Sequence, residues 1–279
     1  MSQKKVTKEQ PVDQLAGAKN LLKNPKAKRV GIIAIVVLLI VGGVYAYKNF
    51  VSGPADEKAQ TQITEAITKL NNARQMQQQY LQVVAAPDSL IEQQMRMGGM
   101  ITTTNADSAK KQVADYRANA KKQVDDLFNQ VLKGQAQYPG LIKLANGGGN
   151  AGNMANYLAG VTYYMMGNVK EAIKYLEDFS PKGDLGVSPQ ALATLASCYV
   201  SDKQIDKAIE AYKDAASEAD NASLSPLYLI EAGKLLESQK KKEDAHALYV
   251  EIKEKYPTFG LSQQGMLDSE VDKYIERTK

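Results

Sequence analysis

Residues 30–47 read VGIIAIVVLLIVGGVYAY, an uncharged run of 18 residues. As a helix that rises about 1.5 Å per residue, this run would be about 27 Å long, close to the thickness of the hydrocarbon core of a bilayer. Tyr45 and Tyr47 lie at its far end, where amphipathic rings favour the membrane interface, and Lys48 follows them. The run predicts a transmembrane helix over residues 30–48 in contact with the lipid bilayer. The alternative is a helix buried in a soluble core.

The 29 residues before this run are basic. They carry eight Lys or Arg and two acidic residues, a net charge of +6, while the whole chain carries +4. Because positive flanks stay in the cytoplasm, residues 1–29 are predicted to be a basic cytoplasmic tail and the run an uncleaved signal anchor. We therefore expect a single-pass protein of the bacterial inner membrane with a periplasmic C-terminal domain. The rest of the chain lacks the basic excess of a nucleic-acid-binding protein, so no nucleic acid is expected as a partner.

The residue types that usually carry enzyme chemistry are scarce. The chain has one cysteine, Cys198, and one histidine, His246, which excludes an intrachain disulfide and most zinc or His-based catalytic sites. Asp125 and Asp126 are adjacent, and neighbouring residues of a helix point about 100° apart, so they form a poor catalytic pair. We predict a non-enzyme with no catalytic residue, no metal and no cofactor.

Residues 55–145 are predicted to form a helical neck region. Apolar residues recur at helical spacing over 55–86 in a Gln-rich context, and Pro87 ends that helix. A short helix is expected over 88–97 with Asp88 as its N-cap, and a third helix over 107–133. The glycine-rich segment NGGGNAGN, residues 146–153, is expected to be a connection between helices.

A repeat with a period of 36 to 37 residues follows the neck. A small residue recurs in the first predicted helix of each unit (Gly160, Ala196, Gly233), and another recurs in the second (Ala172, Ala208, Ala245). We expect the two small residues of a unit to meet, so that its helices approach closely, while tyrosines fill the space between units. One helix pair leaves an apolar face exposed, so the pairs must stack. The chain is therefore predicted to be all-α: one N-terminal transmembrane helix, the neck, and a TPR-type α-solenoid over residues 151–279 with a C-terminal cap helix.

The segments AGNMANYLAG and KEAIKYLEDF, together with the signal anchor and neck, resemble the YfgM-like family of bacterial envelope proteins, most closely its Bacteroidetes-type members. The resemblance is strongest over residues 150–279 and is only architectural over 1–149. It implies an ancillary subunit of the SecYEG translocon, often associated with the periplasmic chaperone PpiD. The alternative is a TPR adaptor of another cell-envelope complex, in secretion or outer-membrane assembly.

A concave wall formed by the first helices of the repeats is the predicted protein-binding groove. Its residues combine adaptable methionines with tyrosines that offer contact area at low entropic cost. They are Met154, Tyr157, Val161, Tyr164, Met165, Leu227 and Ile230. Because Tyr157 and Val161 stand where a carboxylate clamp would need basic or amide side chains, we do not expect that mode of peptide binding. The alternative to an open groove is that these side chains pack against the protein's own helices from about 107 to 145.

Overall fold

The structure is a computed structural model that describes residues 57–135, 137–257, 259 and 266–279. Within these residues every element is an α-helix, apart from one antiparallel bridge between Gln135 and Tyr138. The all-α prediction is confirmed for this part of the chain. The predicted tail at 1–29 and the predicted span at 30–48 lie outside it. Among the helices that are described, none combines the length and apolar character needed to cross a membrane.

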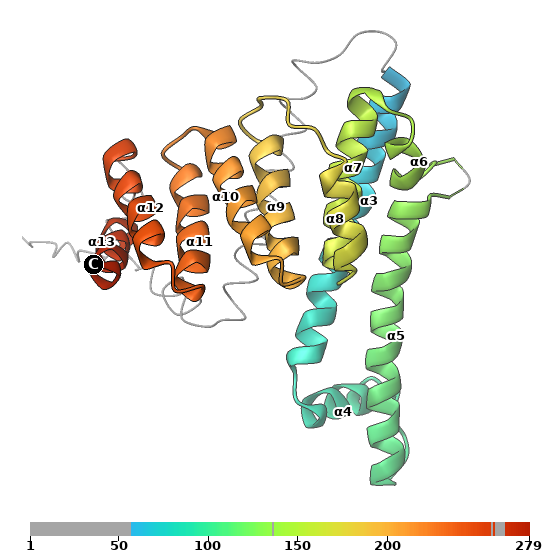
Figure 1. Cartoon of the computed structure of the whole chain (residues 1–279). Coiled ribbons are helices and arrows are strands. Elements are labelled where there is room, and N and C mark those ends of the chain that lie inside the picture. Colours follow the sequence, from blue (N-terminus) through green and yellow to red (C-terminus); the bar gives the residue numbers. More distant parts are fainter. Residues whose placement is uncertain (1–56, 136, 258, 260–265) are drawn as a thin grey trace, which may run out of the picture.

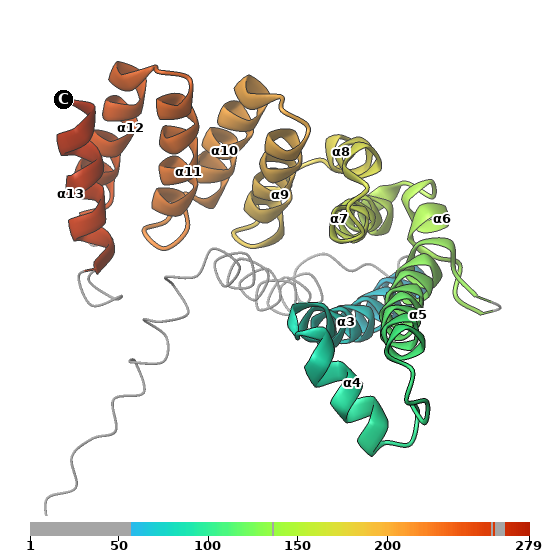
Figure 2. The ribbon, with the colours of Figure 1, turned by 90° about the horizontal axis from the view of Figure 1, so that it is seen from below.

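The helices fall into an N-terminal group and a row. The N-terminal group consists of α3 (Glu57–Ala85), α4 (Asp88–Met97), α5 (Ala106–Lys133) and the short α6 (Leu141–Ala145). The row consists of α7 (Gly149–Met165), α8 (Val169–Glu177), α9 (Val187–Ser201), α10 (Ile205–Ala219), α11 (Ser225–Ser238), α12 (Lys242–Lys255) and α13 (Met266–Thr278). Each helix of the row packs chiefly on its neighbours in sequence, and α7 also contacts α3, α5 and α6 (Figures 1 and 2).

Local sequence sets the ends of α4 and α5. Pro87 separates α3 from α4, and Asn105 caps α5 by accepting a hydrogen bond from the Ser108 amide at 2.9 Å. The prediction that Asp88 caps α4 is wrong, because Pro87 holds the N-cap position and Asp88 lies in the first turn. The Asp88 carboxylate instead pairs with Arg117 of α5.

The glycine-rich segment 146–153 is only partly a connection, which corrects the prediction. Helix α7 begins inside it, at Gly149. Gly148 and Gly149 have φ values of 69° and 65°, a region that glycine enters without steric cost, so the chain turns there and then continues as helix. The short helix α6 just before it was not foreseen.

The same turn joins the two helices in each of the three pairs α7–α8, α9–α10 and α11–α12. Its left-handed residue is Gly167, Lys203 or Lys240, with φ of 79°, 64° and 64°. The next residue donates its amide to a carbonyl five residues earlier, over 2.9, 2.9 and 3.0 Å. These residues are 36 and 37 positions apart, the spacing of the predicted repeat. Backbone conformation therefore recurs with the sequence period.

Close approach within the pairs depends on glycine, and in the first pair Gly160 meets the backbone of Ala172 as expected, at 3.2 Å from the position of a Cβ. The position where a Cβ would stand on Gly233 is 2.5 Å from the ring of Tyr249, and on Gly160 it would collide with Leu176. Glycine therefore faces a large side chain four residues beyond the small residue of the partner helix. Ala172, Ala208 and Ala245 are nevertheless fully buried, so both helices need small residues at the crossing.

Three clusters of buried apolar residues hold the molecule together. The largest joins the first part of α3 and the end of α5 to helices α6–α10. A second runs from α10 to α13, where Val271 and Tyr274 are buried against the last pair. The third is small and separate, and it fixes α4 to the beginning of α5 through Ile91, Met95 and Val113.

Candidate protein-binding surface

The predicted wall residues of the first unit lie at the junction between the row and the N-terminal helices. Met154, Tyr157 and Val161 of α7 are buried, with exposed fractions of 7%, 1% and 2%. The Tyr157 hydroxyl donates to Gln190 Oε1 of α9 at 3.3 Å, and burial raises the pKa of this phenol. Its ring lies 5.9 Å from that of Phe179. Tyr157 thus ties α7 to the second pair from within the core.

Helices α3 and α6 cover α7 at this junction. Gln77 of α3 donates from Nε2 to the carbonyl of Met165, the last residue of α7, over 3.0 Å. Arg74, one turn earlier on α3, is 3% exposed, and burial lowers the pKa of its guanidinium. Helices α5 and α6, which also contact α7, belong to the range from about 107 to 145 that we considered as the alternative to a groove, whereas α3 lies upstream of it.

The remaining predicted wall residues retain more surface. Tyr164 and Met165 near the end of α7 and Leu227 on α11 are half-buried, whereas Ile230 is 6% exposed. Tyr228, beside Leu227, is also half-buried, and burial raises its pKa to about 12. Tyr164, Met165 and Leu227 therefore retain part of their surface, while the four buried residues contribute to the packing of the core.

Tyrosines bridge neighbouring helices along the row. The Tyr199 hydroxyl of α9 donates to Glu177 of α8, and the Tyr249 hydroxyl of α12 donates to Glu237 of α11, both at 2.6 Å. Arg277 of the cap helix binds Glu237 with two nitrogens, at 2.8 and 2.6 Å. These charge-assisted bonds fix the orientation of one helix against the next.

The residues that could carry chemistry are engaged in packing or surface pairs. Cys198 is fully buried, and burial raises the pKa of its thiol to about 12, so the thiol is protonated at neutral pH. His246 Nδ1 lies 3.1 Å from the Thr278 hydroxyl, and Asp125 and Asp126 pair with lysines one turn away on α5. No cluster of three or more metal-binding side chains occurs within the described residues.

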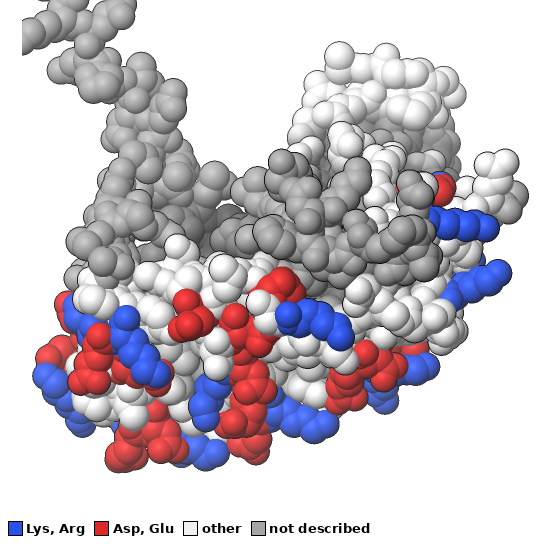
Figure 3. All heavy atoms as spheres, turned by 90° about the horizontal axis from the view of Figure 1, so that it is seen from above, with Lys and Arg blue, Asp and Glu red and all other residues white. Residues whose placement is uncertain are grey.

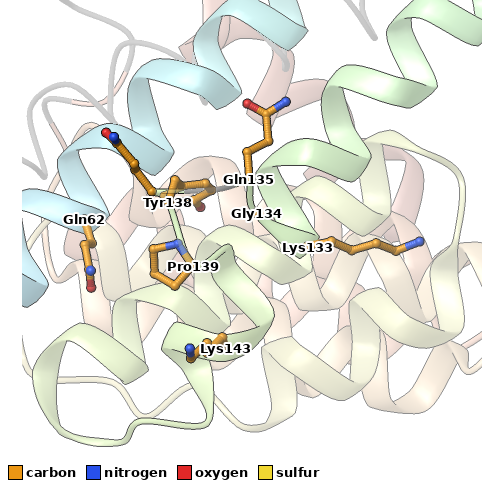
Figure 4. A pocket seen from close by; sticks show the side chains of 8 residues that line it. Gln62, Lys133, Gly134, Gln135, Tyr138, Pro139 and Lys143 are labelled. Carbon is orange, nitrogen blue, oxygen red and sulfur yellow. The ribbon is translucent and has the colours of Figure 1, made fainter.

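Two shallow hollows lie outside this surface. One, of about 560 Å³, is bordered by Gln62 of α3, Lys133 at the end of α5 and Lys143 of α6, beside the tight loop that Gly134 and Gly140 close (Figure 4). The other, of about 590 Å³, lies among α10, α11 and α12 and is lined by charged side chains of both signs. Figure 3 shows acidic and basic side chains interspersed along one face, with no patch of a single sign there.

Comparison of the chain with family models, with curated proteins and with solved structures gives no significant match.

Sequence reasoning missed one prominent surface. Met97 at the end of α4 and Met100 just after it are 82% and 57% exposed. Leu90 and Met97 are seven residues apart, so they share a helix face, while Ile91 and Met95 occupy the buried one. The seven-residue spacing of Leu90 and Met97 could have indicated this second apolar face from the sequence alone.

Proposed function

We propose that this chain is a membrane-anchored protein-binding scaffold, an ancillary subunit of the SecYEG translocon that acts on or near translocated proteins together with periplasmic chaperones. One observation supports the protein-binding part of this proposal. Three helix pairs share a turn that recurs every 36 to 37 residues, with glycine or alanine at each helix crossing. Arrays of this kind stack into TPR-type solenoids, whose extended surfaces serve protein binding.

Anchoring in the membrane would help such a scaffold to bind its partners. A span at residues 30–48 would confine the helical domain to one side of the membrane, near partners held in the same bilayer. Confinement raises effective concentration, so a modest intrinsic affinity suffices for stable association. The half-buried Tyr164, Met165 and Leu227 supply adaptable contact surface for a partner segment.

Affinity capture of the full chain from membranes solubilised in mild detergent tests the proposal. We expect translocon subunits, with a periplasmic chaperone of the PpiD type, to be enriched over a control that carries the tag alone. Enrichment of a secretion or outer-membrane assembly complex would favour the alternative adaptor role. Absence of any membrane complex would contradict both.

The binding surface is tested by the double variant Tyr164→Ala with Leu227→Ala. We expect capture of the partner to fall at least tenfold, about 1.4 kcal/mol of binding free energy. Tyr256→Ala is the matched control, because Tyr256 is also half-buried but lies at the end of α12. Equal capture by the wild-type protein and the double variant, with helix content intact, would place the binding surface elsewhere.

A further inference from the structure

Exposed apolar side chains are concentrated in one part of the molecule, which we call the arm: residues 76–126, comprising the end of α3, all of α4 and the first part of α5. In the described residues eight large apolar side chains are exposed, and seven of them lie between Met76 and Tyr116. The eighth, Leu185, lies in the loop before α9. Figure 1 shows α4 and the beginning of α5 standing clear of the row.

Polar contacts at both ends hold the outward face of α4 in place. Arg117 of α5 binds Asp88 at the start of α4 and donates to the carbonyl of Ala86 at 2.6 Å. Arg96 pairs with Glu92 and donates to the carbonyl of Thr103 at 2.7 Å. Leu90, Met97 and Met100 are therefore presented on a fixed surface, not on a loose loop.

The exposed residues of α3 continue a buried stripe. Ile63, Ile67, Leu70, Arg74, Gln77, Leu81 and Val84 alternate spacings of four and three residues, the 3.5-residue period of helices that pack side by side. The first four are buried, and Gln77 contacts the end of α7. Beyond α7, Leu81 and Val84 are 42% and 47% exposed. The stripe thus has the spacing of a surface that packs against a helix. At Leu81 and Val84, however, no helix among the described residues covers it.

Charge argues against an anionic partner and is compatible with an identical one. The arm has six acidic and six basic residues, and eight of them form the ion pairs Arg96–Glu92, Arg117–Asp88, Lys121–Asp125 and Lys122–Asp126. A nucleic acid or an anionic membrane would favour a basic arm. Two copies of a neutral surface approach without repulsion, and twofold pairing is the commonest form of self-association.

The size of the surface also suits a pair. The described part of α5 within the arm is about 30 Å long, and two helices side by side are about 20 Å wide, which gives a footprint of about 600 Å². Two copies would together bury about 1,200 Å², the lower end of the range for stable interfaces. We propose that two copies of this chain associate through their arms, with the α4 faces of Leu90, Met97 and Met100 paired across a twofold axis and Leu81 and Val84 packed beside them.

Cysteine cross-linking in the full chain tests the pairing. Cys198→Ala removes the lone cysteine, and Met97→Cys is then oxidised mildly in detergent. We expect a disulfide-linked dimer in high yield. Leu185→Cys is the matched control, because Leu185 is 68% exposed but lies outside the arm, and it should stay largely monomeric. Equal yields at the two positions, or a link from Met97→Cys to a different polypeptide, would overturn the proposal.

Charge insertion tests it without a disulfide. The double variant Met97→Glu with Met100→Glu should raise the dimer dissociation constant at least tenfold, measured by light scattering with the detergent contribution removed. Leu185→Glu should leave it unchanged. Because all three side chains are exposed, circular dichroism should show the same helix content in every variant. A wild-type protein that scatters as a monomer would also overturn the proposal.

Discussion

The row and the arm are built from the same secondary structure but hold together differently. In the row, short helices cross at glycine or alanine, and bulky side chains such as Tyr249 and Leu176 fill the space that the missing side chains leave. In the arm, α4 joins the end of α3 to the beginning of α5 through a small cluster, and large apolar side chains of all three helices remain in solvent. In the row, contacts between neighbouring helices bury most of the large apolar side chains. In the arm, several large apolar side chains are left uncovered by its own helices.

Truncating a large side chain at the head of the row should have the largest effect. Tyr157→Ala removes a 1% exposed ring that contacts α9 and Phe179, and we expect the free energy of unfolding to fall by about 3–5 kcal/mol. Tyr116→Ala, in the arm, removes a ring that is 37% exposed and should cost less than about 0.5 kcal/mol. Urea unfolding followed by circular dichroism measures both. Similar losses would erase the distinction between the two regions.

Adding a methyl group at a helix crossing should have the next largest effect. Gly233→Ala places a Cβ 2.5 Å from the Tyr249 ring, which is fully buried, hydrogen-bonded to Glu237 and stacked on Tyr274. Because this ring has little freedom to move, we expect a loss of about 1–3 kcal/mol. Gly98→Ala in the arm meets its nearest neighbours at 3.4 Å and should be close to neutral. A stabilised Gly233→Ala protein would contradict the packing described for the row.

Removing the clamp on the arm should have a moderate and local effect. Arg117→Ala frees the corner between α3 and α4, and we expect a loss of about 1–2 kcal/mol with faster proteolysis near residues 84–90. Lys122→Ala breaks a solvent-exposed pair with Asp126 and should change neither property. If cleavage at the corner is equal in the two variants, Arg117 does not hold α4.

Relieving the strained turns of the row should give a smaller effect of opposite sign. Lys203 and Lys240 occupy the left-handed conformation that Gly167 occupies in the first pair. Lys203→Gly should therefore raise the free energy of unfolding by about 0.5–1 kcal/mol, whereas Gly167→Ala should lower it. Destabilisation by Lys203→Gly would show that the lysine side chain contributes more than its backbone costs.

The smallest effect concerns the charged end of the row. Burial alone would raise the pKa of Glu237, but its hydrogen bonds from Arg277 and Tyr249 outweigh burial, so the pKa lies below its ordinary value. A depressed carboxyl pKa stabilises the fold above the unfolded value of about 4.3, and this contribution is lost as pH falls through the folded pKa. Glu237→Gln should remove that pH dependence, worth at most about 1 kcal/mol. A wild-type protein with equal stability at pH 3 and pH 6 would contradict it.

The sequence predicted the helices well where local signals dominate. Pro87 and the stripe over 107–133 placed α3, α4 and α5 to within a few residues. The sequence did not predict which distant segments pack against each other. Tyr157 and Val161 show the same spacing whether they line an open groove or a core, and only the fold reveals that Gln77, 88 residues before Met165, brings α3 against α7. The start of α7 was also hidden, because consecutive glycines indicate a turn without showing where helix resumes.

Hydrogen exchange across the full chain in detergent tests the contrast between row and arm most directly. Amides of α9 to α12 should exchange slowest, close to the rate set by global unfolding. Those of the outer arm, residues 78–86 and 114–122, should exchange at least tenfold faster, with α4 intermediate. Uniform protection across both regions, or faster exchange in the row than in the arm, would contradict the account.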